Sequence, residues 1–208
     1  MAKTDASRRS GVPRTGLSPE EARQRAVEIA VARIRENGFV KLRLADVARE
    51  MGVSHAALYA HFRDKAALLD AVTESWLVDA RARTAAICAG SAPPAERIED
   101  WFVARYRIKS ARVRTDPEIF YGFNEATAGE RPVIRDHMLR LHQELAGLLR
   151  EAGLGAEAEA TMLEEALAGF LHPALIGPGP KPEREDALRR LLKVVLAGLA
   201  ASQEGGGA

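Results

Sequence analysis

The chain is poor in the residues that define several large classes of protein. Cys88 is the single cysteine among 208 residues, so neither a disulfide within the chain nor a multi-cysteine zinc site can form. Aromatic residues make up only 5% of the sequence, and no apolar run approaches the ~20 residues that cross a bilayer. The basic N-terminus is not followed by the apolar core of an export signal. We therefore expect a protein of the reducing cytoplasm.

The net charge is only +1, but the charged residues are unevenly distributed. Up to Lys65 there are 13 Lys and Arg against 8 Asp and Glu, whereas the remainder has 17 against 21. A basic N-terminal segment on a mildly acidic body is typical of a tethered nucleic-acid-binding module. A surface without any such role can show the same imbalance, so charge alone leaves both interpretations open.

Strong local signals mark the start of the chain. Residues 1–16 are rich in Ser, Thr, Arg, Gly and Pro, which predicts a disordered basic arm. The following Ser18-Pro-Glu-Glu provides a helix N-cap, a proline at the first helical position and the Glu21 of a capping box. Apolar residues then repeat at helical spacing, and Asn37-Gly38 is expected to end this first helix.

The remaining pattern is helical throughout. No segment shows the sustained alternation of a half-buried strand, so the sequence predicts an all-α fold. We expect helices at 18–37, 44–50, 55–62, 64–89, 95–115, 117–128, 132–151, 156–172 and 183–202. A disordered tail is expected at 204–208.

The segment from Leu44 to Phe62 contains the motif most relevant to function. Two short amphipathic helices flank Gly52, a residue that can adopt the positive φ of a tight turn. Val53, Leu58 and Phe62 are placed to pack the second helix against the first. The outer face then carries His55, Ala56, Tyr59 and His61, where a recognition helix would meet the major groove. A helical hairpin without any DNA role remains the alternative for this motif alone.

A longer pattern around this motif resembles the tetracycline-repressor (TetR) family. It covers about 18–69 and comprises Gly38-Phe39, Asp46-Val47-Ala48, Gly52-Val53-Ser54, Leu58-Tyr59, His61-Phe62, Asp64-Lys65 and Leu68. The resemblance implies a three-helix DNA-binding domain at 17–65 and a larger effector-binding and dimerisation domain at 66–203. It further implies a homodimeric regulator on a palindromic operator, and most such relatives are repressors that a small molecule releases.

The resemblance also assigns roles to individual side chains. Ser54, Tyr59, His61 and Lys65 match positions that usually contact phosphates, while His55, Ala56 and Ala57 match positions that face bases. Alanine methyls can read only apolar features such as the thymine methyl, so His55 is expected to be the main polar base reader. A phosphate contact remains the alternative for His55.

Arg43 departs from the pattern, because relatives usually carry Thr or Ser at this position. The second helix thereby loses a capping hydroxyl, and Arg43 gains access to a phosphate or a guanine edge. A solvent-exposed arginine without a DNA role is the alternative. Two interpretations also remain for the N-terminal arm, which carries Lys3, Arg8, Arg9 and Arg14. It either follows a neighbouring DNA groove or is a solvated leader.

The regulatory sites are expected in the remaining helices. The candidate effector site consists of aromatic and polar residues around a predicted bend: Trp101, Tyr106, Phe120, Tyr121, Phe123, Asn124 and His137. Their composition favours a largely apolar small molecule, although plain core packing explains each aromatic residue as well. The candidate dimer interface is an apolar stripe on the last two helical stretches: Leu163, Leu167, Phe170, Leu188, Leu192, Val195, Leu196 and Leu199. Intrachain packing is the alternative for this stripe.

The sequence gives little support to catalysis or metal binding. His137 and His142 are five residues apart and so do not share a helix face as a ligand pair would. Cys88 and His172 lack a local nucleophile signature. We therefore expect no metal, no cofactor and no enzymatic activity. A dimeric helical interaction module without DNA binding is the other competing class, and a mobility-shift assay would separate it from a regulator.

Overall fold

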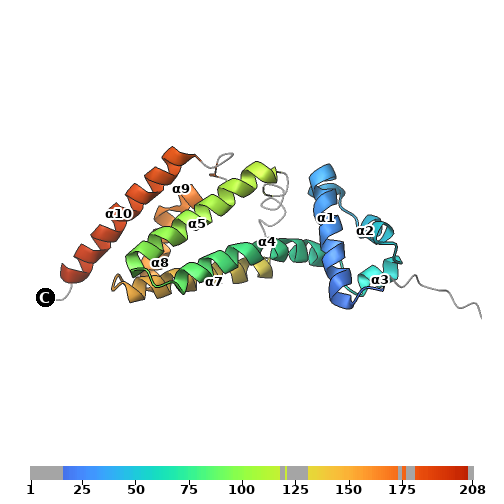
Figure 1. The fold of residues 1–208 in the computed structure, drawn as a ribbon, viewed down its shortest axis with the longest axis horizontal. Helices are drawn as coiled ribbons and strands as arrows, with labels where there is room; N and C mark the ends of the chain where they lie inside the picture. Colours follow the sequence, from blue (N-terminus) through green and yellow to red (C-terminus); the bar gives the residue numbers. More distant parts are fainter. Residues whose placement is uncertain (1–15, 118–119, 121–130, 173–174, 177–180, 206–208) are drawn as a thin grey trace, which may run out of the picture. The chain divides into compact units, whose positions relative to one another are not determined.

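The computed structural model describes residues 16–117, 120, 131–172, 175–176 and 181–205. Within these ranges every regular element is a helix, which confirms the all-α prediction (Figure 1). The chain divides into two compact units, Met1–Val72 and Thr73–Ala208, and the boundary lies inside one helix. The expected basic arm lies outside the described residues apart from Gly16. None of the described helices has the length and hydropathy of a membrane-crossing segment.

The helices follow the expected order, but several of their bounds differ from the predicted ones. They are α1 (Pro19–Lys41), α2 (Leu44–Met51), α3 (His55–Tyr59), α4 (Lys65–Cys88), α5 (Pro94–Thr115), α7 (Pro132–Glu151), α8 (Glu157–Ala166), α9 (Ala168–Leu171) and α10 (Pro182–Gly205). The stretch expected at 156–172 divides at Leu167, whose φ of −99° and ψ of 7° are not helical. Most of the stretch expected at 117–128 lies outside the described residues. α10 continues to Gly205, into the expected tail.

The first unit begins with the expected capping box. The Ser18 hydroxyl accepts a hydrogen bond from the Glu21 backbone N–H at 3.2 Å, and the Glu21 carboxylate accepts one from the Ser18 N–H at 2.7 Å. α1 does not end at Asn37-Gly38 but kinks there, because Gly38 adopts a φ of 78° before the chain resumes a helical turn to Lys41. Glycine tolerates this left-handed conformation, so the helix bends instead of ending.

We expect Ser18→Ala to lower the free energy of unfolding by about 1 kcal/mol, because the first turn of α1 loses its side-chain acceptor. Urea denaturation measures the change. Ser202→Ala is the matched control, since this exposed hydroxyl donates only to the Gly198 carbonyl within α10. A loss in the control as large as in Ser18→Ala would contradict the capping assignment.

The core of the first unit joins α1, α2 and α3, with α2 packed against both other helices. Ala26, Ile34, Val47, Leu58 and Phe62 are fully buried in this unit. Val47 comes from α2 and Leu58 from α3, so both short helices are anchored from beneath. This packing fixes the position of α3 and leaves its opposite face to solvent.

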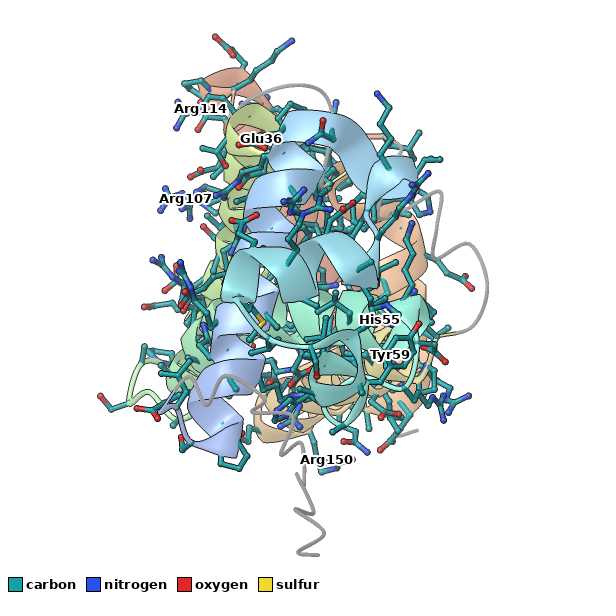
Figure 2. The ribbon with its side chains drawn as sticks, turned by 90° about the vertical axis from the view of Figure 1, so that its right-hand side faces the viewer. Glu36, His55, Tyr59, Arg107, Arg114 and Arg150 are labelled. Carbon is teal, nitrogen blue, oxygen red and sulfur yellow. The ribbon has the colours of Figure 1, made fainter. Side chains whose placement is uncertain are left out.

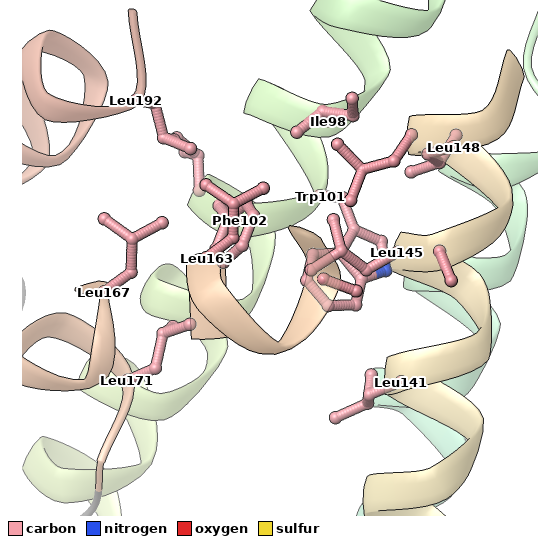
Figure 3. Packing of buried hydrophobic residues seen from close by; sticks show 14 of the residues in the cluster. Ile98, Trp101, Phe102, Leu141, Leu145, Leu148, Leu163, Leu167, Leu171 and Leu192 are labelled. Carbon is pink, nitrogen blue, oxygen red and sulfur yellow. The ribbon is translucent and has the colours of Figure 1, made fainter. Parts of the chain in front are cut away.

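The second unit has a larger apolar core. α5 contacts α7, α9 and α10, and α8 packs against α7 and α9. Figure 3 shows buried side chains from all five helices converging, and they include Ile98, Trp101, Phe102, Leu141, Leu145, Leu148, Leu163, Leu167, Leu171 and Leu192. α5 therefore lies at the centre of this unit, where a charged residue on its inner face would be exceptional.

Candidate functional site

The turn between α2 and α3 sets the position of the candidate DNA-reading helix. Gly52 adopts φ 69° and ψ 25°, a left-handed conformation that other residues rarely occupy. Its N–H donates to the carbonyls of Ala48 and Arg49, and the Val53 N–H donates to Ala48 at 3.0 Å. The chain thus reverses tightly at the end of α2 and delivers Ser54 to the start of α3.

α3 is short and is held by its cap and its buried side. The Ser54 hydroxyl oxygen accepts from the Ala57 N–H at 3.1 Å and remains able to donate its own proton outward. Ser54, His55 and Ala56 are exposed, and Ala57 is half-buried. The base-facing and phosphate-facing candidates therefore start on a solvent-accessible helix end.

An aromatic pair forms the exposed side of α3. The His55 and Tyr59 rings have centroids 4.6 Å apart and meet edge to face at 67°. Figure 2 shows the two side chains next to each other. Tyr59 is 44% exposed although it is a large aromatic residue. The contact orients His55, while the Tyr59 hydroxyl remains available to an external acceptor.

His61 is positioned by a residue that the sequence did not single out. The Arg23 Nη1 donates to the His61 backbone carbonyl at 3.2 Å, and its guanidinium lies 4.7 Å from the centre of the Phe62 ring. Arg23 therefore ties the end of α3 to α1. Arg23 precedes these partners by almost 40 positions, so no local pattern could have revealed the contact.

Lys65 is expected to donate to a DNA phosphate, but in the structure its ammonium already makes hydrogen bonds within the protein. Its Nζ donates to the Phe39 carbonyl at 2.9 Å and to the Val40 carbonyl at 3.1 Å, which joins the start of α4 to the end of α1. Partial burial lowers the pKa of Lys65. An ammonium has three N–H groups, so one remains for a phosphate, and Lys65 is first a positioning residue.

Arg43 stands at the N-cap of α2 without a side-chain capping bond and is exposed. It borders a groove of about 400 Å³ lined by Arg33, Asn37, Val40, Lys41, Leu42, Arg43 and Asp46. Val40, which is 92% exposed, forms part of the rim. The sequence predicts a helix end at Gly38, whereas the structure has a kink there that brings the end of α1 beside Arg43. The sequence therefore does not predict this basic groove.

The candidate effector residues that the structure describes are mostly core residues. Trp101 and Tyr106 are fully buried, His137 is buried and Phe120 is half-buried. The Trp101 indole N–H donates to the Glu144 carboxylate at 2.9 Å, and the Tyr106 hydroxyl accepts from the Lys181 N–H at 3.3 Å. The other three candidates, Tyr121, Phe123 and Asn124, lie outside the described residues.

Two cationic side chains that the sequence did not single out lie on α5, the helix of Trp101 and Tyr106: Arg105 is buried and Lys109 is half-buried. Burial lowers the pKa of Arg105 to about 10 and that of Lys109 to about 7. Lys109 donates to the Leu171 carbonyl at 2.6 Å, whereas the Arg105 guanidinium lies 4.3 Å from the Trp101 ring centre. Burial, followed by nearby cations, lowers the pKa of His137 to about 4, so its ring is neutral at pH 7.

The candidate dimer stripe is largely an intrachain core, and its prediction needs correction. Leu163, Leu167, Leu188 and Leu192 are completely buried within the chain, and Leu199 is buried beside them. The remaining candidates, Phe170, Val195 and Leu196, are partly buried against the same cluster. A side chain already covered by its own chain cannot line an interface in this conformation, because no surface is left to bury.

A different face of α10 is open to solvent. Val194 is 70% exposed, and Ala197, Gly198 and Ala201 are exposed at helical spacing from it. Met162 of α8 is also exposed despite its size. Val194, Ala197 and Ala201 lie on the opposite side of the helix from Leu188 and Leu192, so the expected stripe did not include them.

Neither a metal site nor a reactive thiol is found in the described part of the chain. No three His, Cys, Asp or Glu side chains among the described residues gather as metal ligands. Burial, with the Glu144 and Glu151 carboxylates nearby, raises the pKa of Cys88 to about 11. This thiol therefore stays protonated at neutral pH, where it is a poor nucleophile.

Comparison with known proteins follows the two-unit division. The pattern of bacterial regulatory proteins of the tetR family matches residues 27–72, and the tetracyclin repressor-like C-terminal domain matches residues 94–192. No curated protein sequence matches the chain.

Solved structures share the fold. A transcriptional regulator from Pseudomonas aeruginosa PAO1 gives a TM-score of 0.64 at 19% identity, covering 92% of this chain and 97% of that one. A TetR/AcrR regulator from Thermobifida fusca gives 0.60 at 22%, covering 85% and 97%. A regulator from Saccharomonospora viridis in complex with choline gives 0.59 at 23%, covering 86% and 96%. The chain therefore belongs to the TetR family and is a DNA-binding transcriptional regulator, not an enzyme.

Proposed function

We propose that the chain represses transcription in the bacterial cytoplasm as a homodimer, bound to a palindromic operator until a small-molecule effector releases it. The main support for a DNA-binding surface is the exposed His55–Tyr59 pair on α3. This helix is capped by Ser54 and anchored by buried Leu58. Buried anchors beneath exposed polar groups are what a recognition helix needs in order to enter a major groove without deforming.

Chemistry divides the proposed DNA contacts into two groups. The hydroxyls of Ser54 and Tyr59 and the ring of His61 donate to phosphates, which sets the register without reading sequence. His55, Ala56 and Ala57 face the base edges, with His55 as the polar reader. Arg43 and the neighbouring Lys41 border the basic groove, and we propose a phosphate there.

We expect Tyr59→Phe to weaken binding to every DNA sequence by a similar factor of about 10 or more, because one hydrogen bond to a charged acceptor is lost. The phenyl ring retains the edge-to-face contact, so His55 stays oriented. His55→Ala should instead relax the preference at one position of each half-site. Mobility-shift titrations on an operator selected from random DNA, and on its single-base variants, measure both effects. A Tyr59→Phe loss confined to one operator position would contradict the phosphate assignment.

Dimerisation is proposed through the open face of α10, formed by Val194, Ala197, Gly198 and Ala201. Small residues let the backbones of two helices approach closely, and Val194 supplies apolar area to bury. A two-fold dimer supplies the symmetry that a palindromic operator requires.

Control by an effector requires a structural element shared by both functions. α4 contains the boundary between the two units, so a change of this helix in the second unit reaches the first along a continuous backbone. The choline complex of the S. viridis regulator supports a small-molecule site in this fold. A ligand releases DNA only by binding the DNA-free state more tightly, and operator must then weaken ligand binding by the same factor. Calorimetric titrations with and without operator test this reciprocity, and equal affinities would disprove the coupling.

A further inference from the structure

The second unit contains buried polar atoms that lack any protein partner. Arg105 is only 6% exposed, and neither its Nε nor its Nη1 has a hydrogen-bond acceptor. The Ser110 hydroxyl is completely buried without a partner, and so is the Nδ1 of buried His137. Buried polar groups are almost always paired in folded proteins, because each unpaired one loses its hydration without compensation. The Arg105 donors thus find no acceptor among the described residues, which indicates an acceptor from outside the protein.

These side chains belong to two helices in contact. Arg105 and Lys109 lie one turn apart on α5, while His137 lies on α7, which packs against α5. The charged groups acting on His137 are Arg81, Arg105, Lys109 and Arg140, all of them cations. The region between the two helices therefore carries a positive potential, which favours an anion.

Two carboxylates act on Arg105 through space, and each is hydrogen-bonded to another side chain. Glu144 accepts from the Trp101 indole N–H at 2.9 Å, and one oxygen of Glu164 pairs with His142 Nδ1 at 3.1 Å. The second Glu164 oxygen is buried without a partner and does not bond to Arg105. Both carboxylates attract Arg105 through space, but neither satisfies its N–H groups. The guanidinium thus keeps the donors at Nε and Nη1 free.

We propose that this unit binds a small apolar acid, whose carboxylate takes the free donors of Arg105 and lies near Lys109 and His137. The sequence favours a largely apolar effector, and the cations of α5 indicate that this effector also carries an anionic head group. The His137 ring is neutral, so it brings no charge of its own to the site. Its unpaired Nδ1 can donate or accept one hydrogen bond. The regulatory meaning of the site rests on the proposed effector-released repressor, whereas binding itself does not.

The surroundings favour an apolar body behind the head group. Phe102, Leu141 and Leu171 are buried on the helices that carry or contact the cations, and Lys109 bonds directly to the Leu171 carbonyl. The hydrocarbon of a ligand leaves water when it enters among such side chains, and this stabilises a complex in proportion to the ligand area removed from water. A carboxylate on an alkyl chain combines both requirements, so decanoate is a suitable probe.

Calorimetry on the full-length protein tests the proposal with three probes. We expect decanoate to bind the wild type at least about 10-fold more tightly than the equally long neutral decanol, because a charged hydrogen bond is lost with the alcohol. Decyl phosphate distinguishes carboxylate from phosphate recognition and should bind more weakly than decanoate. Equal binding of decanoate and decanol, or no binding of either, would overturn the proposal, as would tighter binding of decyl phosphate.

Two variants on α5 assign the effect to the proposed donor. Arg105→Met should weaken decanoate binding by about 10- to 100-fold while leaving decanol unchanged. Arg114→Met, which removes an exposed arginine from the same helix, is the matched control and should bind decanoate like the wild type. Unchanged decanoate affinity in Arg105→Met would overturn the assignment.

The melting temperature of the free protein separates a ligand-binding arginine from a structural one. Arg105→Met should not lower it, because the substitution removes two buried N–H donors that lack acceptors and retains apolar volume. A marked decrease would show that Arg105 supports the fold and would count against the site.

Mobility-shift assays then separate this inference from the proposed regulation. Decanoate binding through Arg105 without release of DNA would support the acid site and contradict effector control. DNA release by a neutral molecule, together with absent decanoate binding, would support effector control and overturn the acid site.

Discussion

Replacing Arg97 with methionine is expected to lower the free energy of unfolding by about 3 kcal/mol, because three groups lose their donor at once. The Arg97 Nε donates to the Ala92 carbonyl at 2.9 Å and its Nη1 to the Cys88 carbonyl at 2.6 Å. Its Nη2 pairs with the Glu151 carboxylate at the end of α7. One nearly buried guanidinium thus ties together the end of α4, the loop that follows it and the end of α7.

Arg107 is the matched control for this prediction. It makes two hydrogen bonds of 2.7 Å to the Glu185 carboxylate, but its side chain is 60% exposed. Water screens and replaces such a pair, so Arg107→Met should cost less than about 1 kcal/mol. Urea denaturation of the two variants gives the comparison. Equal losses would show that burial and the carbonyl contacts of Arg97 contribute nothing beyond a surface ion pair.

Local chemistry made the first unit the more predictable part of the chain. The capping box of Ser18 and Glu21, the Gly52 turn and the Ser54 cap each depend on residues within a few positions of one another. Asp64 caps α4 in the same local way, since its carboxylate accepts from the Ala67 N–H at 2.7 Å. Signals of this kind act before tertiary structure, so they can be read from sequence alone.

Contacts between distant residues could not be predicted in the same way. Lys65 was assigned to phosphate from its motif position, yet two of its N–H groups bond to carbonyls at the end of α1. Arg105 and Lys109 appear in the sequence as ordinary charges on an amphipathic helix. Burying them costs free energy that no local signal records, so only the packed structure reveals that they face inward.

The stripe on α10 shows a second limit of periodicity. Hydrophobic spacing identifies an apolar face but not which neighbour covers it, and α10 needs one face for the core and another for a partner. Leu188 and Leu192 are completely buried in the chain, whereas Val194, two positions from Leu192, is exposed. The proposed interface is therefore at Val194 and not at Leu188 and Leu192. This changes which substitutions should separate two protomers.

Val194→Glu is expected to give folded monomers and to weaken operator binding by at least about 100-fold, because two linked half-sites bind far more tightly than one. The new carboxylate is solvated in the monomer but would be buried unpaired against a partner. Leu192→Glu should instead unfold the second unit, since that side chain is fully buried. Leu139→Glu, at a 55% exposed leucine of α7, should leave a dimer with normal operator affinity. Light scattering, thermal melting and mobility shifts on the three variants test the assignment. A Val194→Glu protein that remains a dimer would place the interface on another face.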